Sequence, residues 1–191
     1  MALANPEQRL SEARYLEIER AADFKSEFYD GEMFAMAGET RDHSLIASNL
    51  VRELGNRLGN RPCVVFNSDL RVKIQATGLF TYPDASVVCG PEEYVPGVDD
   101  TLVNPTFVAE VLSDSTEAYD RGKKAENYRQ IVSLREYMLL SQKEPHVELF
   151  TRWEGQWALR EVSGLDAVVE LPALSVTLAL SELYAKVGCQ M

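Results

Sequence analysis

Two acidic side chains stand out because each interrupts an otherwise apolar stretch of the chain. Asp84 lies in the segment YPDASVV, and Glu110 lies in TFVAEVL. A lone charge in a buried strand costs several kcal/mol of desolvation unless a partner compensates it. Two such strands, each with one carboxylate, therefore predict a shared cation. The alternative is an acid at a strand end and an acid satisfied by backbone groups or by arginine.

Magnesium is the cation that these residues suit. Mg²⁺ prefers oxygen ligands, commonly takes one or two carboxylates, and leaves room for water and phosphate oxygens. Asp84 and Glu110 supply two carboxylates, and the backbone carbonyl of Val111 supplies a third oxygen. A metal ion held in this way polarises a phosphoryl oxygen and lowers the pKa of a water molecule. We therefore expect these three residues to bind Mg²⁺ or Mn²⁺.

Chemistry at a phosphate also needs a cationic group that orients water or neutralises charge in the transition state. The predicted helix after Glu110 offers Lys123 and Lys124. Asp120 and Lys124 are spaced i,i+4, which is also the pattern of a surface salt bridge worth roughly 0.2–0.5 kcal/mol. We favour a catalytic role for Lys124, because the pair follows directly on the Glu110 strand.

Two further residues are secondary candidates for the same site. Glu32 shares the period-2 phase of Phe34 and Met36 on the second arm of a predicted hairpin, so it points where these apolar side chains point. The alternative is a solvated glutamate at the hairpin tip. His43 lies on the inward face of the first turn of a predicted helix. It either packs there through hydrogen bonds or contacts a substrate phosphate.

The elements that must position these residues follow from periodicity and turn signals. We expect a helix over residues 6–22, a hairpin turning at Asp30-Gly31, and a helix that begins after Thr40 and ends at Gly59. Two short strands follow over 63–67 and 70–74. Pro83 cannot donate a ladder hydrogen bond, so Asp84 should lie at a strand start, an edge or an irregularity.

The second half of the chain continues the alternation of strands and helices. A surface loop over 90–105 precedes the TFVAEVL strand, and a helix capped by Ser115 is expected to run to about Ser133. Strands over 135–142, 146–153 and 156–162, joined by tight turns, predict an antiparallel meander. Short β segments and a last helical turn close the chain. Together these patterns predict one α/β domain over residues 1–191.

Composition places limits on the compartment and the partner. The net charge of −11 and the pI of about 4.7 count against a protein whose main task is to grip nucleic acid. We see no apolar run long enough to span a membrane and no secretory signal. Cys63, Cys89 and Cys189 have no C-x-x-C spacing, so we expect reduced, buried thiols in a cytoplasmic protein rather than a zinc site.

A set of motifs across nearly the whole chain resembles a large bacterial family of endonuclease-like proteins, formerly a domain of unknown function. The motif residues are Pro83-Asp84, Glu110-Val111-Leu112-Ser113, Ser115-Thr116, Asp120, Lys124, Tyr128 and Ser133-Leu134-Arg135-Glu136-Tyr137, with Asp30-Gly31-Glu32, His43 and residues 68–72 before them. Members of this family look like the PD-(D/E)XK, or restriction-endonuclease-like, superfamily. The resemblance implies a central mixed β-sheet flanked by helices, here with an N-terminal helix and hairpin and a C-terminal antiparallel meander.

The same resemblance implies Asp84 and Glu110 as metal ligands and Mg²⁺-dependent hydrolysis of phosphodiester bonds. We expect DNA as the substrate. One position departs from the superfamily pattern. The lysine expected two residues after the glutamate is Leu112 here, so Lys124 would have to serve in its place. Three readings stay open at this point. They are a metal-dependent endonuclease, a nuclease-fold binding or regulatory module that does not cleave, and a hydrolase of a phosphorylated small molecule. Analogy with nucleases that cut two strands with two sites suggests a homodimer.

Overall fold

The structure is a computed structural model that describes residues 9–36 and 38–188. Its helices are α1 (Glu12–Ala21), α2 (Arg41–Leu58), α3 (Glu117–Tyr119), the π-helical turn η2 (Asp120–Lys124), α4 (Ala125–Tyr128) and α5 (Leu180–Leu183). Its strands are β1 (Ser26–Tyr29), β2 (Glu32–Ala35), β3 (Cys63–Asn67), β4 (Arg71–Ile74), β5 (Leu79–Thr81), β6 (Ala85–Cys89), β7 (Thr101–Leu102), β8 (Phe107–Leu112), β9 (Glu136–Ser141), β10 (His146–Trp153), β11 (Gln156–Ser163), β12 (Val168–Leu171) and β13 (Val176–Ala179). This is the α/β mixture that the sequence predicts.

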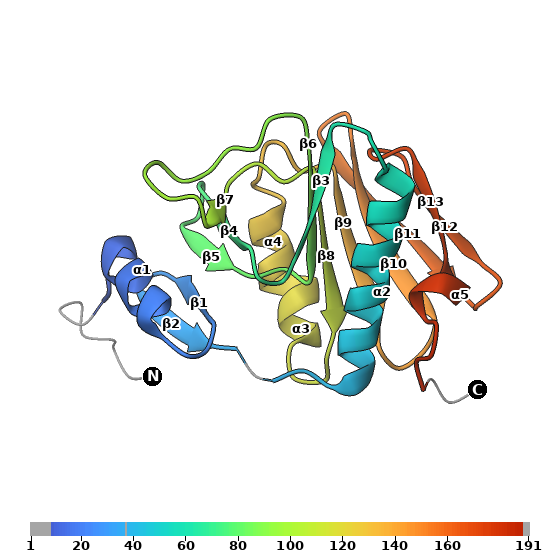
Figure 1. Ribbon diagram of the computed structural model, residues 1–191, viewed down its shortest axis with the longest axis horizontal. Helices are drawn as coiled ribbons and strands as arrows, with labels where there is room; N and C mark the ends of the chain where they lie inside the picture. The colour runs from blue at the N-terminus through green and yellow to red at the C-terminus, as the bar shows by residue number, and fades with distance from the viewer. Residues whose placement is uncertain (1–8, 37, 189–191) are drawn as a thin grey trace.

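The central sheet has six strands in the order β11-β10-β9-β8-β6-β3 (Figure 1). β8 and β9 are parallel, whereas the other neighbours in this sheet are antiparallel. The predicted meander is therefore confirmed as β9-β10-β11. A second mixed sheet, with the order β2-β1-β5-β4-β7, carries the N-terminal hairpin, and β12 and β13 form a small third sheet. This second sheet was not predicted from the sequence, which indicated one central sheet.

The central sheet is covered on both faces. On one face, Leu50 of α2 packs in a cluster with Ala109 and Val111 of β8 and with residues of β12 and β13. On the other face, Leu112 of β8 packs in a cluster with Tyr128 of α4 and with residues of the second sheet. Successive residues of a strand point to opposite faces, so the even-numbered side chains of β8 lie on the α4 face.

Local sequence explains the elements that carry the site. The side chain of Thr40 accepts a hydrogen bond from the backbone N–H of His43 at 3.1 Å and thereby caps α2, which ends at Gly59 with φ 53°. Asp30 and Gly31 have φ values of 49° and 83°, as a two-residue hairpin turn requires. Both predictions are confirmed.

Several predicted boundaries are wrong. α1 begins at Glu12 rather than at residue 6, because Ser11 caps it, and residues 6–8 lie outside the described chain. The predicted loop over 90–105 contains β7, which pairs in parallel with β4. The helical segment begins at Glu117 and ends at Tyr128, and the hydroxyl of Ser113, not of Ser115, accepts from the N–H of Thr116 at its start.

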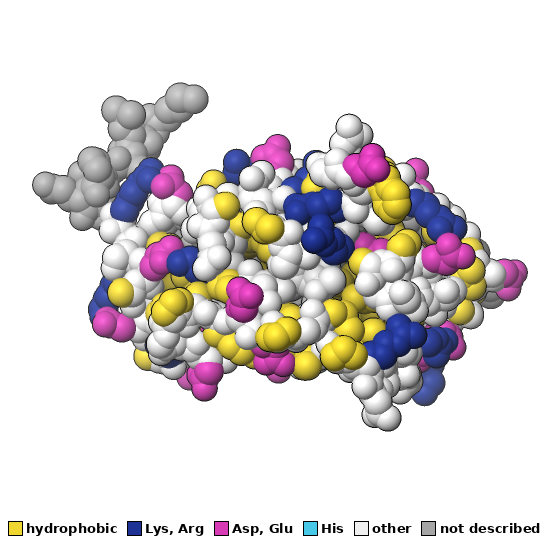
Figure 2. Space-filling view, turned by 90° about the horizontal axis from the view of Figure 1, so that it is seen from above, with side chains coloured by type: hydrophobic (Ala, Val, Ile, Leu, Met, Phe, Trp, Pro, Cys, Tyr) yellow, Lys and Arg dark blue, Asp and Glu magenta, His cyan; other side chains and the backbone are white. Residues whose placement is uncertain are grey.

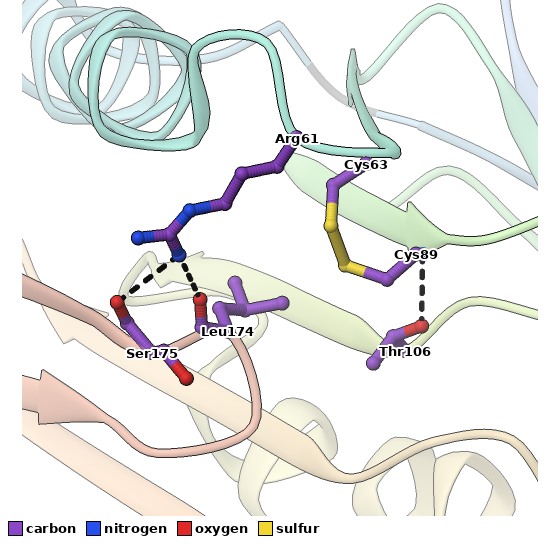
Figure 3. The surroundings of a disulfide bond; sticks show 6 residues. All are labelled: Arg61, Cys63, Cys89, Thr106, Leu174 and Ser175. Atoms are coloured by element: carbon purple, nitrogen blue, oxygen red, sulfur yellow. Dashed lines mark hydrogen bonds between the residues drawn. A yellow bond between two sulfur atoms is a disulfide. The ribbon is translucent and has the colours of Figure 1, made fainter.

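Cys63 and Cys89 form a disulfide with an S–S distance of 2.08 Å (Figure 3). The antiparallel register of β3 and β6 places the two residues directly opposite each other, with 4.0 Å between their Cα atoms. Thr106 accepts a hydrogen bond from the backbone N–H of Cys89 beside the bridge. The prediction of reduced, buried thiols is therefore wrong for these half-buried cysteines, and Cys189 lies outside the described residues.

In the part of the chain that the structure describes, no helix has both the length and the apolar character needed to cross a membrane.

Candidate active site

The ammonium group of Lys124 lies at the centre of a cluster of carboxylates. Its Nζ is 2.8 Å from Glu110 Oε1, 2.9 Å from Glu27 Oε1 and 3.6 Å from Asp120 Oδ1. The Lys124 and Asp120 side chains both belong to η2 and retain only 6% and 4% of their exposure. Single π-helical turns within helices are frequent at functional sites. Asp120 and Lys124 therefore do not form the surface salt bridge that their spacing also allowed.

Glu110 approaches this cluster from the centre of the main sheet. It lies on the α4 face of β8, as its even number in the strand requires. The hydroxyl of Tyr128 donates a hydrogen bond to Glu110 Oε1 at 2.7 Å. Burial raises the pKa of Glu110 well above its ordinary value; Lys124 opposes this effect, whereas the charges of Asp120 and Asp84 add to it. The buried carboxylate is thus held by one hydroxyl and one ammonium group.

Leu112 and Glu110 point to the same face of β8, because they are two residues apart. Leu112 is buried in the cluster that includes Ala125 and Tyr128 of α4. The helical segment formed by η2 and α4 packs on this face of β8 and places the ammonium group of Lys124 beside Glu110. A cation therefore lies beside the glutamate although the strand itself does not supply it.

Asp84 lies immediately before β6, and a strand start is one of the three positions that Pro83 allowed. The register that pairs Ala85 with Ala109 places Asp84 next to Glu110 on the neighbouring strand. Asp84 Oδ2 accepts a hydrogen bond from the backbone N–H of Val111 at 2.7 Å, which fixes the carboxylate against β8. Val111 thus contacts Asp84 through its amide, and the same residue lines the adjoining cavity.

His43 contacts the residues that the sequence predicts as metal ligands. Its Nε2 lies 3.3 Å from Asp84 Oδ2 and 3.3 Å from Glu39 Oε2, and its side chain is 6% exposed. Burial lowers the pKa of His43, but the hydrogen bond and charge of Asp84, the charge of Glu39 and a backbone hydrogen bond with Val111 outweigh it, so the net direction is upward. These contacts favour the imidazolium form, held between two carboxylates.

Glu32 does not join the cluster. It is exposed at the start of β2, near the hairpin tip, and does not line the cavity. Glu27 on β1 supplies the hairpin's acid instead, and it also accepts hydrogen bonds from Thr81 and from Tyr119, the latter at 3.2 Å. Sequence reasoning missed Glu27. No local signal could have selected it, because the four-residue segment SEFY contains two polar residues and is too short to show a period, although Ser26, Glu27 and Phe28 are all buried.

A cavity of about 680 Å³ opens beside these residues. Asp84, Glu110 and Lys124 line one part of it, and the β1–β2 hairpin forms another wall. Its size falls in the range of pockets that bind small molecules or single groups of a larger ligand. The three residues predicted to act together therefore lie on one concave surface.

The charge balance and the donor set of this site fit a divalent cation. The acids Glu27, Asp84, Glu110, Asp120 and Glu39 surround two basic groups, Lys124 and His43. Carboxylate and backbone carbonyl oxygens are the ligands that Mg²⁺ and Mn²⁺ prefer. Burial, together with the charges of Asp120 and Asp84, raises the pKa of Glu110, and an added positive charge would stabilise its ionised form.

A second group of histidine and glutamate side chains, which are residue types that can bind metal ions, lies on β10 and β11. Among the described residues, the donor atoms of His146, Glu148 and Glu161 lie within 4.8 Å of one another on β10 and β11. Arg121 of η2 already forms an ion pair with Glu148. This group does not line the cavity, and no sequence motif pointed to it.

The six-stranded mixed sheet, with helices on its faces and the Asp84 and Glu110 carboxylates on adjacent strands, is a restriction-endonuclease-like fold. A crystal structure described as a "putative nuclease belonging to DUF820", from Anabaena variabilis ATCC 29413, matches it with a TM-score of 0.73. The two share 20% sequence identity, and the match covers 91% of this chain and 96% of that chain. The predicted fold class is thereby confirmed.

The chain belongs to the Uma2 family. The model of this family, described as "Putative restriction endonuclease", matches residues 12–181. Two similar proteins come from Synechocystis sp. (strain ATCC 27184 / PCC 6803 / Kazusa). "Uncharacterized protein slr1290" is 34% identical over 180 residues, covering 94% of this chain and 93% of the relative. "Uncharacterized protein sll1609" is 34% identical over 168 residues, covering 87% and 95%. The family resemblance carried by the motifs is confirmed.

Proposed function

We propose that this protein is an endonuclease that hydrolyses phosphodiester bonds in DNA with Mg²⁺ or Mn²⁺. The observation that carries the proposal is the meeting of Asp84, Glu110 and Lys124 at one cavity, with Lys124 Nζ 2.8 Å from Glu110. The family description and the description of the similar structure both name nucleases, which supports this reaction class.

Asp84, Glu110 and the carbonyl of Val111 are the residues that would hold the metal ion. The ion supplies Lewis acidity toward a phosphoryl oxygen and makes water a stronger nucleophile near neutral pH. The hydrogen bond from the Val111 amide to Asp84 Oδ2 orients one carboxylate, and the hydroxyl of Tyr128 orients the other. Each predicted carboxylate ligand is thus held in place by a second residue, which reduces the reorganisation needed on binding.

Lys124 supplies the positive charge of the site. Burial alone would lower the pKa of this lysine, but the charges of Glu110, Glu27 and Asp120 raise it well above its ordinary value, so the ammonium form persists. A buried ammonium group beside the phosphate stabilises the charge that develops in the transition state far more than an exposed one would. We assign Lys124 the role of the lysine that the superfamily places at position 112.

A binding or regulatory module without cleavage is the second candidate. Two observations favour it. The ammonium group of Lys124 is already surrounded by three carboxylates, and the chain carries a net charge of −11. A module of this kind would use the same cavity to bind a ligand without hydrolysis.

A cleavage assay separates the two candidates. Purified protein is incubated with supercoiled plasmid, single-stranded DNA and RNA, each with Mg²⁺ and with Mn²⁺. The endonuclease proposal predicts cleavage by the wild type and a loss of at least about a hundredfold for both Asp84→Asn and Lys124→Met. Glu32→Gln is the matched control, because Glu32 is exposed and lies off the cavity, and it should cleave normally. Equal activity in Asp84→Asn would refute the proposal, and absence of cleavage by folded wild type would favour the binding module.

A further inference from the structure

One wall of the cavity is formed by aromatic and apolar side chains instead of acids. Tyr29, Phe34 and Met36 of the β1–β2 hairpin and its continuation line it. The hairpin register pairs Glu27 with Phe34, and directly opposed residues share a face of the sheet. The hairpin therefore presents Glu27 to Lys124 and Phe34 to the adjoining space. Phe34 remains 49% exposed, so an open aromatic surface adjoins the buried acids.

The acids themselves are recessed. The side chains of Asp84 and Glu110 are 13% and 6% exposed. A phosphate can therefore approach them only by entering the cavity. A duplex keeps its bases paired and stacked inside a stiff double helix, whereas an unpaired strand can bend into a cavity and turn a base outward without the free-energy cost of removing a nucleotide from the stack. The recessed position of the acids thus favours an unpaired strand over an intact duplex.

The net negative charge of the protein also counts against binding of a long duplex. Proteins that bind duplex nucleic acid depend on many contacts between basic side chains and phosphates. On the face drawn in Figure 2, Lys and Arg side chains form separate groups interspersed with acidic and apolar ones, and the whole chain has a net charge of −11. Beside the aromatic wall, Lys123 Nζ lies 6.0 Å from the centre of the Tyr29 ring. A short stretch of backbone therefore finds a cation beside the aromatic wall, whereas the net charge of −11 opposes the many phosphate contacts that a long duplex needs.

We propose that the substrate strand enters the cavity unpaired, with one nucleobase stacked on Phe34 and Tyr29 while its phosphate lies beside Asp84 and Glu110. This inference rests on the proposed nuclease function and narrows it to single-stranded nucleic acid or an unpaired segment of a duplex. The aromatic wall supplies sequence-tolerant stacking, because every base has a face that can stack. The β1–β2 hairpin is then the element that selects strand form.

Binding is measured by fluorescence anisotropy of labelled oligothymidylate and of the same strand paired with oligoadenylate, in Mg²⁺. Asp84→Asn is used as the background so that the strands stay intact. We expect the single strand to bind at least about tenfold more tightly than the duplex. Phe34→Ala should remove about tenfold of the single-strand affinity, as expected for the loss of one stacked base, and Phe34→Trp should keep it. Phe24→Ala is the matched control, because Phe24 is 61% exposed and does not line the cavity.

The outcomes separate this inference from the nuclease proposal. Duplex binding equal to or tighter than single-strand binding overturns the inference, as does an unchanged affinity in Phe34→Ala. If wild type cleaves duplex as fast as single strand and Phe34→Ala cleaves both normally, the nuclease proposal stands and the inference fails. If wild type cleaves nothing but binds single strands through Phe34, the inference stands and the nuclease proposal fails.

Discussion

Replacing Glu136 by glutamine should make the protein more stable at alkaline pH. Glu136 is fully buried at the start of β9, on the opposite face of the sheet from Tyr137. Its Oε1 accepts one hydrogen bond, from the backbone N–H of Ala173 at 3.1 Å, and its Oε2 has no partner. Burial raises the pKa of Glu136 to about 7, although the Ala173 hydrogen bond opposes the effect.

The size of this stability difference follows from the linkage between proton binding and folding. The folded protein holds the Glu136 proton more strongly than the unfolded chain, whose glutamate has a pKa of 4.5. The contribution of Glu136 to the free energy of unfolding is therefore fully present below pH 4.5. It is lost progressively as the pH rises from 4.5 to about 7. At about 1.36 kcal/mol for each pKa unit, the loss above pH 7 is about 3 kcal/mol. Glutamine mimics the protonated acid and can still accept from Ala173, so Glu136→Gln should escape this loss.

Urea unfolding at pH 5 and pH 8.5, followed by the fluorescence of Trp153 and Trp157, measures the difference. Wild type and Glu136→Gln should differ little at pH 5, whereas the variant should be more stable by about 3 kcal/mol at pH 8.5. Glu144→Gln is the control, because Glu144 is exposed in the turn between β9 and β10. A difference between wild type and Glu136→Gln that is the same at both pH values would refute the reasoning.

Three further changes test other contacts. Lys124→Met should lower the free energy of unfolding by about 3 kcal/mol, because it leaves Glu110 buried beside other acids. In calorimetry, Mg²⁺ should nevertheless bind the variant at least as tightly as it binds wild type. Weaker Mg²⁺ binding by the variant would contradict the role assigned to Lys124. Tyr128→Phe should cost about 1–3 kcal/mol in urea unfolding by removing the donor to Glu110, and an unchanged midpoint would contradict this. Reduction of Cys63–Cys89, which lie 26 residues apart, should cost about 3 kcal/mol, and identical melting with and without dithiothreitol would show that the bridge is not formed or does not stabilise.

The sequence specified the parts of the fold that have strong local signals. The helix after Thr40, the turn at Asp30-Gly31 and the buried strand around Glu110 each follow from periodicity or from a single turn or cap. The strand around Glu110 also fixed which face each side chain takes. The approach of Lys124 to Glu110 was predicted from their order along the chain, and the structure has 2.8 Å between Lys124 Nζ and Glu110 Oε1.

The remaining features depend on contacts between distant segments. Glu27 could not be chosen over Glu32, because two four-residue strands contain too little periodicity to show which acid lies under η2 and which lies at the hairpin tip. The Cys63–Cys89 bridge requires the register of β3 and β6, which no local pattern reveals. β7 forms by pairing with β4, which lies about thirty residues earlier in the chain, and its two residues are too few to carry a strand signal of their own.

Binding of a divalent cation by Asp84 and Glu110 is the central claim, and calorimetric titration of Mg²⁺ tests it most directly. Wild type and Glu32→Gln should each bind Mg²⁺ with the same affinity, because Glu32 is exposed away from the cluster. Asp84→Asn should lose this binding, because it removes one of the two carboxylates that line the cavity side by side. Equal binding of Mg²⁺ by wild type and Asp84→Asn would contradict the assignment of the metal site.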